Sequence, residues 1–318
     1  SVNRKIVQAK MSLSEKTEKK LKEYGSPDLH GKTAIITGAN SGVGFKTAET
    51  LVFLGAKVIL ACRNTEKAEA AKASLLKDYP DAEISVMRLD LADFASIRDF
   101  VRGIEEGGTD IDVFINNAGV LRHPGEKTKD GYDLVIGTNY IGVYYLSELL
   151  FPYLETLDHP VYYVNTVSIA HKIGKIDYND FYCEKKKSLA VYACSKLCLA
   201  SYSYETAKRL ENSNIRVMMN HPGIAITPLG TNAVGKVVKS LAPAVAWLFN
   251  SPEKSSLSAA YILASDPPAG SLIGPTKLFG GWGYPKPNRV SKRIKRGVCG
   301  LAGFTDNEIR KSDPEFKR

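Results

Sequence analysis

The sequence is poor in cysteine and has no long apolar run. Only five of its 318 residues are cysteine, and their spacing fits neither a disulfide framework nor a metal site. This scarcity favours a reducing, cytoplasmic environment over a secreted one. Because no run of about 20 apolar residues is present, no membrane-spanning helix is predicted. The N-terminus also lacks the apolar core of a signal peptide, so we expect an intracellular protein that is soluble or peripherally membrane-associated.

Excess positive charge is confined to the two ends. Residues 1–30 carry seven basic and four acidic side chains, residues 286–318 carry ten and four, and residues 31–285 carry 26 of each. We therefore predict one neutral domain at 31–285, with a polar extension before it and a basic tail after it. The motif SKRIKR at 291–296 leaves two interpretations open, a solvated tail or peripheral contact with an anionic membrane. No aromatic residues interleave with these charges, so no nucleic-acid partner is expected.

Short apolar runs alternate with longer periodic segments along the chain. The short runs predict strands at residues 33–36, 57–62, 83–91, 112–119, 161–168, 215–223 and 274–280. The longer segments predict helices at residues 14–24, 45–55, 65–79, 94–106, 132–154, 188–210 and 252–264. The strands are continuously apolar, as in a parallel sheet covered on both faces. We therefore predict a doubly wound α/β fold of the Rossmann type.

A glycine-rich segment, TGANSGVG at 37–44, lies between the first predicted strand and the first helix of the domain. Gly38, Gly42 and Gly44 permit a tight turn, a close approach of the backbone and close packing of helix on sheet. The helix N-terminus would then face a diphosphate. This context predicts a dinucleotide site.

The end of the second strand decides which dinucleotide is preferred. An acidic residue there would bind a ribose 2′-hydroxyl and repel a 2′-phosphate, but this chain has Cys62, Arg63 and Asn64. Arg63 can bind a phosphate through two hydrogen bonds, each worth about 1.5–3 kcal/mol. We therefore predict NADP(H) over NAD(H); the alternative is that Arg63 only faces solvent.

The segment YACSK at 192–196 and the earlier segment YCEKK at 182–186 share the spacing Tyr-x-x-x-Lys. An ammonium about 4 Å from a phenol, at an effective dielectric near 20, would favour the ionised phenol by about 4 kcal/mol. Tyr192 lies in an apolar helical stretch where a lysine can be buried. Tyr182 lies in a charge-dense segment, where a lysine stays hydrated. We therefore predict that Tyr192 and Lys196 form a proton-transfer pair and that Tyr182 belongs to a loop.

Taken in order, these motifs resemble the short-chain dehydrogenase/reductase family over most of residues 31–285. Further matches are LDL at 89–91, NNAG at 116–119, Asn139 in TNYIG, Ser168 in VNTVSIAH, and HPG at 221–223 followed by Thr227. In many members the serine lies closer to the tyrosine than Ser168 does to Tyr192. The retinol-dehydrogenase-like branch carries an insertion here, and AHKIGKI at 170–176 resembles its beginning.

The resemblance implies an enzyme that interconverts an alcohol and a carbonyl by hydride transfer. Tyr192 would be the acid/base, Ser168 would hold the substrate oxygen, Lys196 would bind the nicotinamide ribose and Asn139 would position a relay water. Cofactor contacts are implied for Gly38, Ser41, Gly42, Val43, Gly44, Arg63, Asn64, Asp90, Leu91, Asn117, Ala118, Gly119, Tyr192, Lys196, Pro222, Gly223 and Thr227.

The branch resemblance implies small apolar substrates such as retinoids, steroids or lipid-like carbonyls. Residues 234–249 interleave apolar side chains with lysines, which leaves a substrate lid and a membrane-contacting helix open. A homo-oligomer and a monomer are both compatible with the resemblance. The competing hypothesis is a catalytically silent nucleotide-binding or scaffolding protein of the same fold.

Overall fold

The computed structural model describes residues 13–121, 125–183, 186–223, 250–277 and 280–318. Eight strands form one sheet in the order β3-β2-β1-β4-β5-β6-β7-β8, and all neighbours are parallel except β7 and β8. The strands are β1 (Thr33–Thr37), β2 (Lys57–Cys62), β3 (Ile84–Arg88), β4 (Val113–Asn116), β5 (Val161–Thr166), β6 (Ile215–Asn220), β7 (Leu272–Gly274) and β8 (Lys286–Asn288). The predicted Rossmann-type fold is confirmed.

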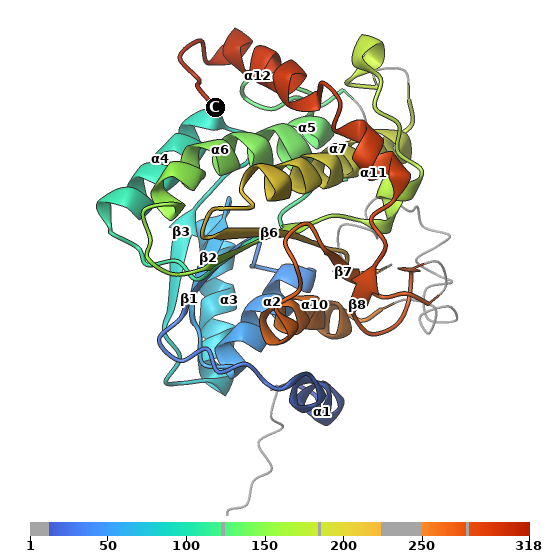
Figure 1. Cartoon of the computed structure of the whole chain (residues 1–318). Helices are drawn as coiled ribbons and strands as arrows, with labels where there is room; N and C mark the ends of the chain where they lie inside the picture. Colours follow the sequence, from blue (N-terminus) through green and yellow to red (C-terminus); the bar gives the residue numbers. More distant parts are fainter. Residues whose placement is uncertain (1–12, 122–124, 184–185, 224–249, 278–279) are drawn as a thin grey trace, which may run out of the picture.

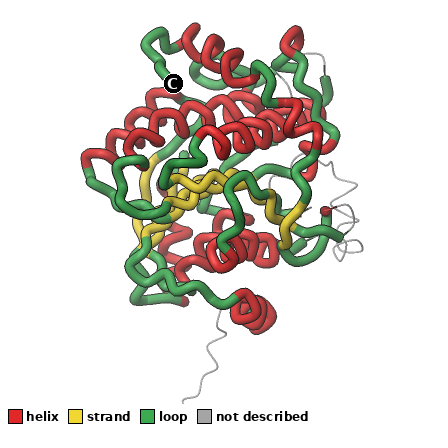
Figure 2. The backbone as a smooth tube through the Cα atoms, in the orientation of Figure 1, coloured by secondary structure: helices red, strands yellow, loops and turns green. Residues whose placement is uncertain are grey.

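Helices cover both faces of the sheet (Figure 1). One face carries α1 (Glu15–Tyr24), α2 (Gly42–Phe53), α3 (Thr65–Asp78) and α10 (Pro252–Ser265). The other carries α4 (Phe94–Glu106), α5 (Leu134–Ile136), α6 (Gly142–Leu154), α7 (Ser188–Arg209), α11 (Lys292–Gly297) and α12 (Leu301–Ser312). Each layer packs an apolar cluster against the strands, and Figure 2 shows the sheet lying between them.

One long helical run lies at the centre of the second face. It joins α5 to α6 through a π-helical turn at Gly137–Ile141. In the described part of the chain, Leu134–Leu154 is the one run long and apolar enough to cross a membrane, and 89% of its most apolar window is buried inside the protein. This run corresponds to the helix predicted at 132–154, and its burial is that of a core helix.

The N-terminal extension contributes a packed helix. Ser14 caps α1, and Leu21 is fully buried. The Tyr24 and Tyr261 rings meet edge to face with their centroids 5.1 Å apart. This helix therefore packs on α10 through one apolar stripe, although it belongs to the segment predicted as a polar extension.

Residues 286–318 are not a solvated tail. They form β8, α11 and α12, and they bury Ile294, Leu301, Ile309 and Phe316. The basic residues lie on the outer side of these elements, and the buried positions between them are too few to stand out in the sequence. The strand predicted at 274–280 is also displaced, because β7 ends at Gly274 directly before Pro275.

The last helix covers a row of tyrosines on the second face. The Tyr140 and Thr305 hydroxyls lie 2.7 Å apart, and Tyr144 donates a hydrogen bond to Asp306. The Tyr145 hydroxyl also contacts Asp313. Thus α12 completes the second layer beside the π-helical turn.

Candidate active site

The cleft lies at the carboxyl edge of the parallel strands. Its volume is about 520 Å³, and the ends of β1, β2, β4, β5 and β6 and the loops that follow them contribute to its lining. The strand order reverses between β1 and β4, which is where open α/β sheets bind their ligands. Of the predicted site residues that the structure describes, only Asn139 does not line the cleft.

The glycine loop is packed as a nucleotide loop requires. Gly38 and Gly42 adopt left-handed φ values of 66° and 59°, which favour glycine. A Cβ on Gly44 would come within 2.4 Å of the Asn117 amide nitrogen and 2.6 Å of the Gly38 oxygen. Larger residues would therefore push α2 away from the loop.

The N-terminus of α2 is open toward the cleft. Ser41 makes no side-chain capping bond, and the first turn has no acidic residue. Ser41, Gly42, Val43 and Gly44 all line the cleft. Free backbone N–H groups at the positive end of the helix dipole suit a diphosphate, so these residues fit the group that the sequence predicts.

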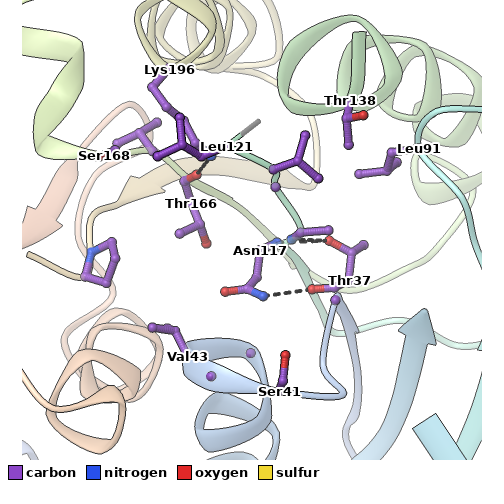
Figure 3. A pocket seen from close by; sticks show the side chains of 18 of the residues that line it. Thr37, Ser41, Val43, Leu91, Asn117, Leu121, Thr138, Thr166, Ser168 and Lys196 are labelled. Atoms are coloured by element: carbon purple, nitrogen blue, oxygen red, sulfur yellow. Dashed lines mark hydrogen bonds between the residues drawn. The ribbon is translucent and has the colours of Figure 1, made fainter. Parts of the chain in front are cut away.

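Thr37 holds the loop after β4 in place. Its hydroxyl accepts hydrogen bonds from the backbone N–H groups of Asn117 and Ala118, at 3.0 and 2.9 Å. The Asn117 side chain in turn donates to the Thr37 carbonyl at 2.9 Å (Figure 3). Sequence analysis assigned Asn117 and Ala118 to the site but overlooked Thr37, the last residue of β1.

The corner beyond β2 is basic. Arg63 is exposed and lines the cleft together with Lys67, which the sequence analysis did not single out. The Asn64 side chain accepts a hydrogen bond from the Lys67 backbone at 2.8 Å and so caps α3. The missed signal is spacing, since Lys67 lies about one helical turn after Arg63.

The loop after β3 and the loop after β6 are each fixed locally. The Asp90 carboxylate accepts from the Ala92 N–H at 3.0 Å. The Pro222 carbonyl accepts from Asn250 and Ser255, at 3.1 and 2.8 Å. Leu91 and Gly223 line the cleft as predicted. Thr227 and the segment 234–249 lie outside the described residues.

Tyr192 and Lys196 lie one turn apart on α7 and both line the cleft. Lys196 is 3% exposed, and its ammonium donates to the Thr166 carbonyl at 2.8 Å (Figure 3). In the described part of the chain no carboxylate forms an ion pair with Lys196. Burial therefore lowers the pKa of Lys196 to about 8.

The tyrosine does not show the lowered pKa that we expected from Lys196. Burial raises the pKa of the Tyr192 phenol, and a hydrogen bond with Ser168 offsets only part of this effect. The Lys196 nitrogen lies 6.0 Å from the Tyr192 ring centroid. Ser168 is nevertheless within hydrogen-bonding reach of the phenol. The two hydroxyl groups that we expected to bind the substrate oxygen therefore lie next to each other.

The Asn139 side chain lies behind the cleft wall, and both of its N–H protons are bonded. Its oxygen accepts from the Val120 N–H at 2.7 Å, and its nitrogen donates to the Val120 carbonyl at 2.9 Å and to Ser195 at 3.2 Å. The amide therefore holds the loop after β4. The relay water that the sequence analysis assigned to Asn139 stays a prediction.

The second Tyr-x-x-x-Lys copy lies away from the cleft. The Tyr182 hydroxyl donates to Glu308 at 2.7 Å, which helps raise the pKa of the phenol. Lys186 pairs with Asp180 at 3.3 Å and is partly solvated. As predicted, Tyr182 lies in a loop.

The fold and the cleft together define a nucleotide-dependent oxidoreductase. The family model described as "short chain dehydrogenase" matches residues 32–236. The chain belongs to the short-chain dehydrogenase/reductase family, which uses NAD(P), and to its retinol-dehydrogenase-like branch.

Two curated human relatives and one solved structure illustrate the similarity. Human retinol dehydrogenase 13 is 37% identical over 244 residues, which are 75% of this chain and 73% of that protein. Human retinol dehydrogenase 12 is 34% identical over 287 residues, 87% of this chain and 88% of that protein. The crystal structure of a putative uncharacterized protein from Mycobacterium paratuberculosis is 31% identical, with a TM-score of 0.71, and covers 91% of this chain and 95% of that one.

Proposed function

We propose that the protein is an NADP(H)-dependent oxidoreductase that interconverts a carbonyl and an alcohol on an apolar substrate, with Tyr192 as the acid/base. One observation carries the proposal. Ser168, Tyr192 and Lys196 line the same cleft as the glycine loop and the open N-terminus of α2. A nucleotide held by that loop and a carbonyl held by Ser168 would therefore meet in one cavity.

Reduction needs a hydride at the carbonyl carbon, which NADPH supplies when bound, and a proton at the oxygen. Tyr192 donates the proton, and Ser168 donates a hydrogen bond that holds the oxygen beside the phenol. The raised pKa keeps Tyr192 protonated at neutral pH, which suits an acid and favours the reductive direction. Below its pKa of about 8, Lys196 keeps its charge and helps to stabilise the phenolate that remains.

NADP(H) is favoured by the basic corner beyond β2. Arg63 and Lys67 both border the cleft there, and α3 has no carboxylate among the cleft-lining residues that the structure describes at this corner. Two cations within reach of a ribose 2′-phosphate would bind it more tightly than a 2′-hydroxyl.

An apolar substrate is favoured by the other end of the cleft. Leu121, Ile169 and Leu189 line it, and Leu189 at the start of α7 is 55% exposed. An apolar side chain left this open beside a site is stabilised when an apolar ligand covers it.

Steady-state kinetics with NADPH and NADH on a panel of apolar aldehydes and ketones tests both claims. We expect turnover with NADPH, and we expect Arg63→Ala to lower kcat/KM for NADPH by about 10- to 100-fold while leaving the NADH value within twofold. Binding of NADPH without turnover of any carbonyl would favour the catalytically silent alternative. An unchanged ratio between the two cofactors in Arg63→Ala would remove Arg63 from the cofactor site.

We also propose that α11 contacts anionic membranes. Lys292, Lys295 and Arg296 are exposed on it. Two exposed apolar residues flank the helix. Ile173, 66% exposed, precedes Gly174, whose carbonyl binds Arg293, and Tyr178, 41% exposed, donates to the Cys299 carbonyl. Basic charge beside exposed apolar side chains is typical of peripheral membrane contact.

Co-sedimentation with phosphatidylserine vesicles tests this surface. Since residues 286–318 are packed on the domain, charge reversal is a better test than truncation. We expect Lys292→Glu/Lys295→Glu to lower the bound fraction several-fold, at about 1 kcal/mol per lysine. The control, Lys19→Glu/Lys22→Glu, makes the same change on α1, which covers the other face of the sheet. Equal losses in both variants would show that only the overall charge matters.

A further inference from the structure

Ser195 lies between the two residues of the proton-transfer pair and is fully buried. Its hydroxyl donates to the Tyr192 carbonyl at 2.8 Å and accepts from the Asn139 amide at 3.2 Å. It is thus the only residue among those described that bonds to both the catalytic turn of α7 and the Asn139 side chain.

Both N–H protons of the Asn139 amide are used in hydrogen bonds. It gives one proton to Val120 and the other to Ser195, and its oxygen accepts from the Val120 N–H. If Ser195 were absent, one amide proton would be buried without a partner, which is the costly condition for a polar group. The amide would then be free to turn, and its two bonds to Val120 would loosen.

The loop that Asn139 holds is part of the cleft wall. A Cβ on Gly119 would lie 3.1 Å from the Asn139 oxygen and 3.5 Å from the Lys196 nitrogen. The loop backbone therefore approaches both groups closely. A small displacement of Val120 would change the position of the cofactor-lining loop relative to Lys196.

We infer that Ser195 is a positioning residue, which fixes the Asn139 amide and, through it, the Gly119–Val120 backbone against the turn of α7 that carries Tyr192. This role deepens the proposed function and rests on it only for its effect on rate. Ser195 touches neither substrate nor cofactor, since it does not line the cleft.

The same helix provides a matched control. Ser203 is also fully buried, donates to a backbone carbonyl of α7, that of Leu199 at 2.6 Å, and accepts from an asparagine amide, that of Asn165 at 2.9 Å. Neither Ser203 nor Asn165 lines the cleft. Ser195→Ala and Ser203→Ala thus each remove one bond to a backbone carbonyl and one bond from an asparagine amide. Both variants should lower the midpoint of thermal unfolding by similar amounts, about 2–4 °C.

Hydrogen exchange separates a positioning role from a merely structural one without requiring a substrate. We expect the Val120 amide to exchange about tenfold faster in Ser195→Ala and at the wild-type rate in Ser203→Ala. Equal exchange in the two variants would overturn the inference. If Ser195→Ala does not accumulate as folded protein, Ser195→Cys, whose thiol is a weaker acceptor, takes its place with a smaller change in the same direction.

Kinetics gives the second arm. With a carbonyl that the wild type reduces, we expect Ser195→Ala to lower kcat about tenfold with KM for NADPH within twofold, and Ser203→Ala to change neither. Adding Ser195→Ala to Asn139→Ala should cause no further loss of kcat, because both act through one amide. An additive loss would contradict the inference. A wild type that reduces no carbonyl would refute the proposed function, while the exchange result would still decide the role of Ser195.

Discussion

The segments 182–186 and 192–196 share the spacing Tyr-x-x-x-Lys, and the fold gives them opposite surroundings. Lys196 is buried without a carboxylate partner in the described part of the chain, and its pKa falls to about 8. Lys186 remains at the surface, paired with Asp180. Tyr192 faces Ser168 in the cleft, whereas Tyr182 is bonded to Glu308 of α12. The spacing brings two side chains together, but burial and partners decide whether they can exchange protons.

The strongest test of the difference between the two tyrosines is to remove each phenol hydroxyl in turn. We expect Tyr192→Phe to lower kcat for carbonyl reduction by about 10²–10⁴-fold, because the proton donor is lost. Tyr182→Phe should keep kcat within twofold, because its hydroxyl serves only the contact with α12. Both are measured as the loss of NADPH absorbance. Full activity in Tyr192→Phe would show that Tyr192 is not the acid/base.

The two lysines should differ in activity and also in stability. Lys196→Met should lower kcat about 100-fold and raise the free energy of unfolding by about 1–3 kcal/mol, because a buried ammonium is removed. Lys186→Met should leave kcat unchanged and alter stability by less than about 0.5 kcal/mol, as expected for a surface pair. Urea unfolding at neutral pH provides the comparison. A destabilised Lys196→Met would show that the Thr166 bond outweighs the cost of burial.

The pH dependence of carbonyl reduction should follow the titration of Lys196 alone. Because its pKa is lowered to about 8 from 10.5, the folded protein loses this proton first as the pH rises. Reduction should slow by about tenfold per unit well above pH 8. Between pH 8 and 10.5 the unfolded chain binds more protons, so this group's contribution makes the fold more stable with rising pH. If Lys186→Met shifted the pH profile of the reduction rate, the assignment of the titration to Lys196 would be wrong.

The smallest effect belongs to the contact between Tyr182 and α12. Glu308→Gln keeps an acceptor but removes the charge, so we expect a loss of about 0.5–1.5 kcal/mol in the free energy of unfolding and no change in kcat. Thermal unfolding with and without NADPH measures it. A change in kcat would extend the active site to α12 and blur the distinction between the two copies.

The sequence predicted the central strands and most of the cleft, because both depend on local patterns. Continuous apolar runs marked the buried strands, and the ends of those strands carry the site residues. What it missed depends on packing between distant segments. Examples are the burial of Ile294 and Phe316 between charged neighbours, and the use of Asn139 as a clamp on Val120.

The direction of the Tyr192 pKa also depends on three-dimensional surroundings. Spacing gave the distance to Lys196 only as one helical turn, and it gave no measure of burial. In the structure, burial outweighs the hydrogen bond to Ser168. Thr37 was missed for a different reason, since it is an ordinary strand residue whose role appears only where the loop after β4 meets it.

The cover that α12 places over the tyrosine row has a consequence for biosynthesis. Tyr140 meets its partner Thr305 across 165 positions of sequence, and Tyr182 meets Glu308 across 126. A ribosome makes α6 and α7 long before α12, so the nascent chain must hold a half-finished layer of aromatic side chains until then. A chain that ended before α12 would therefore expose these aromatic side chains and need chaperones to prevent its aggregation, even though both residues of the catalytic pair had already been translated.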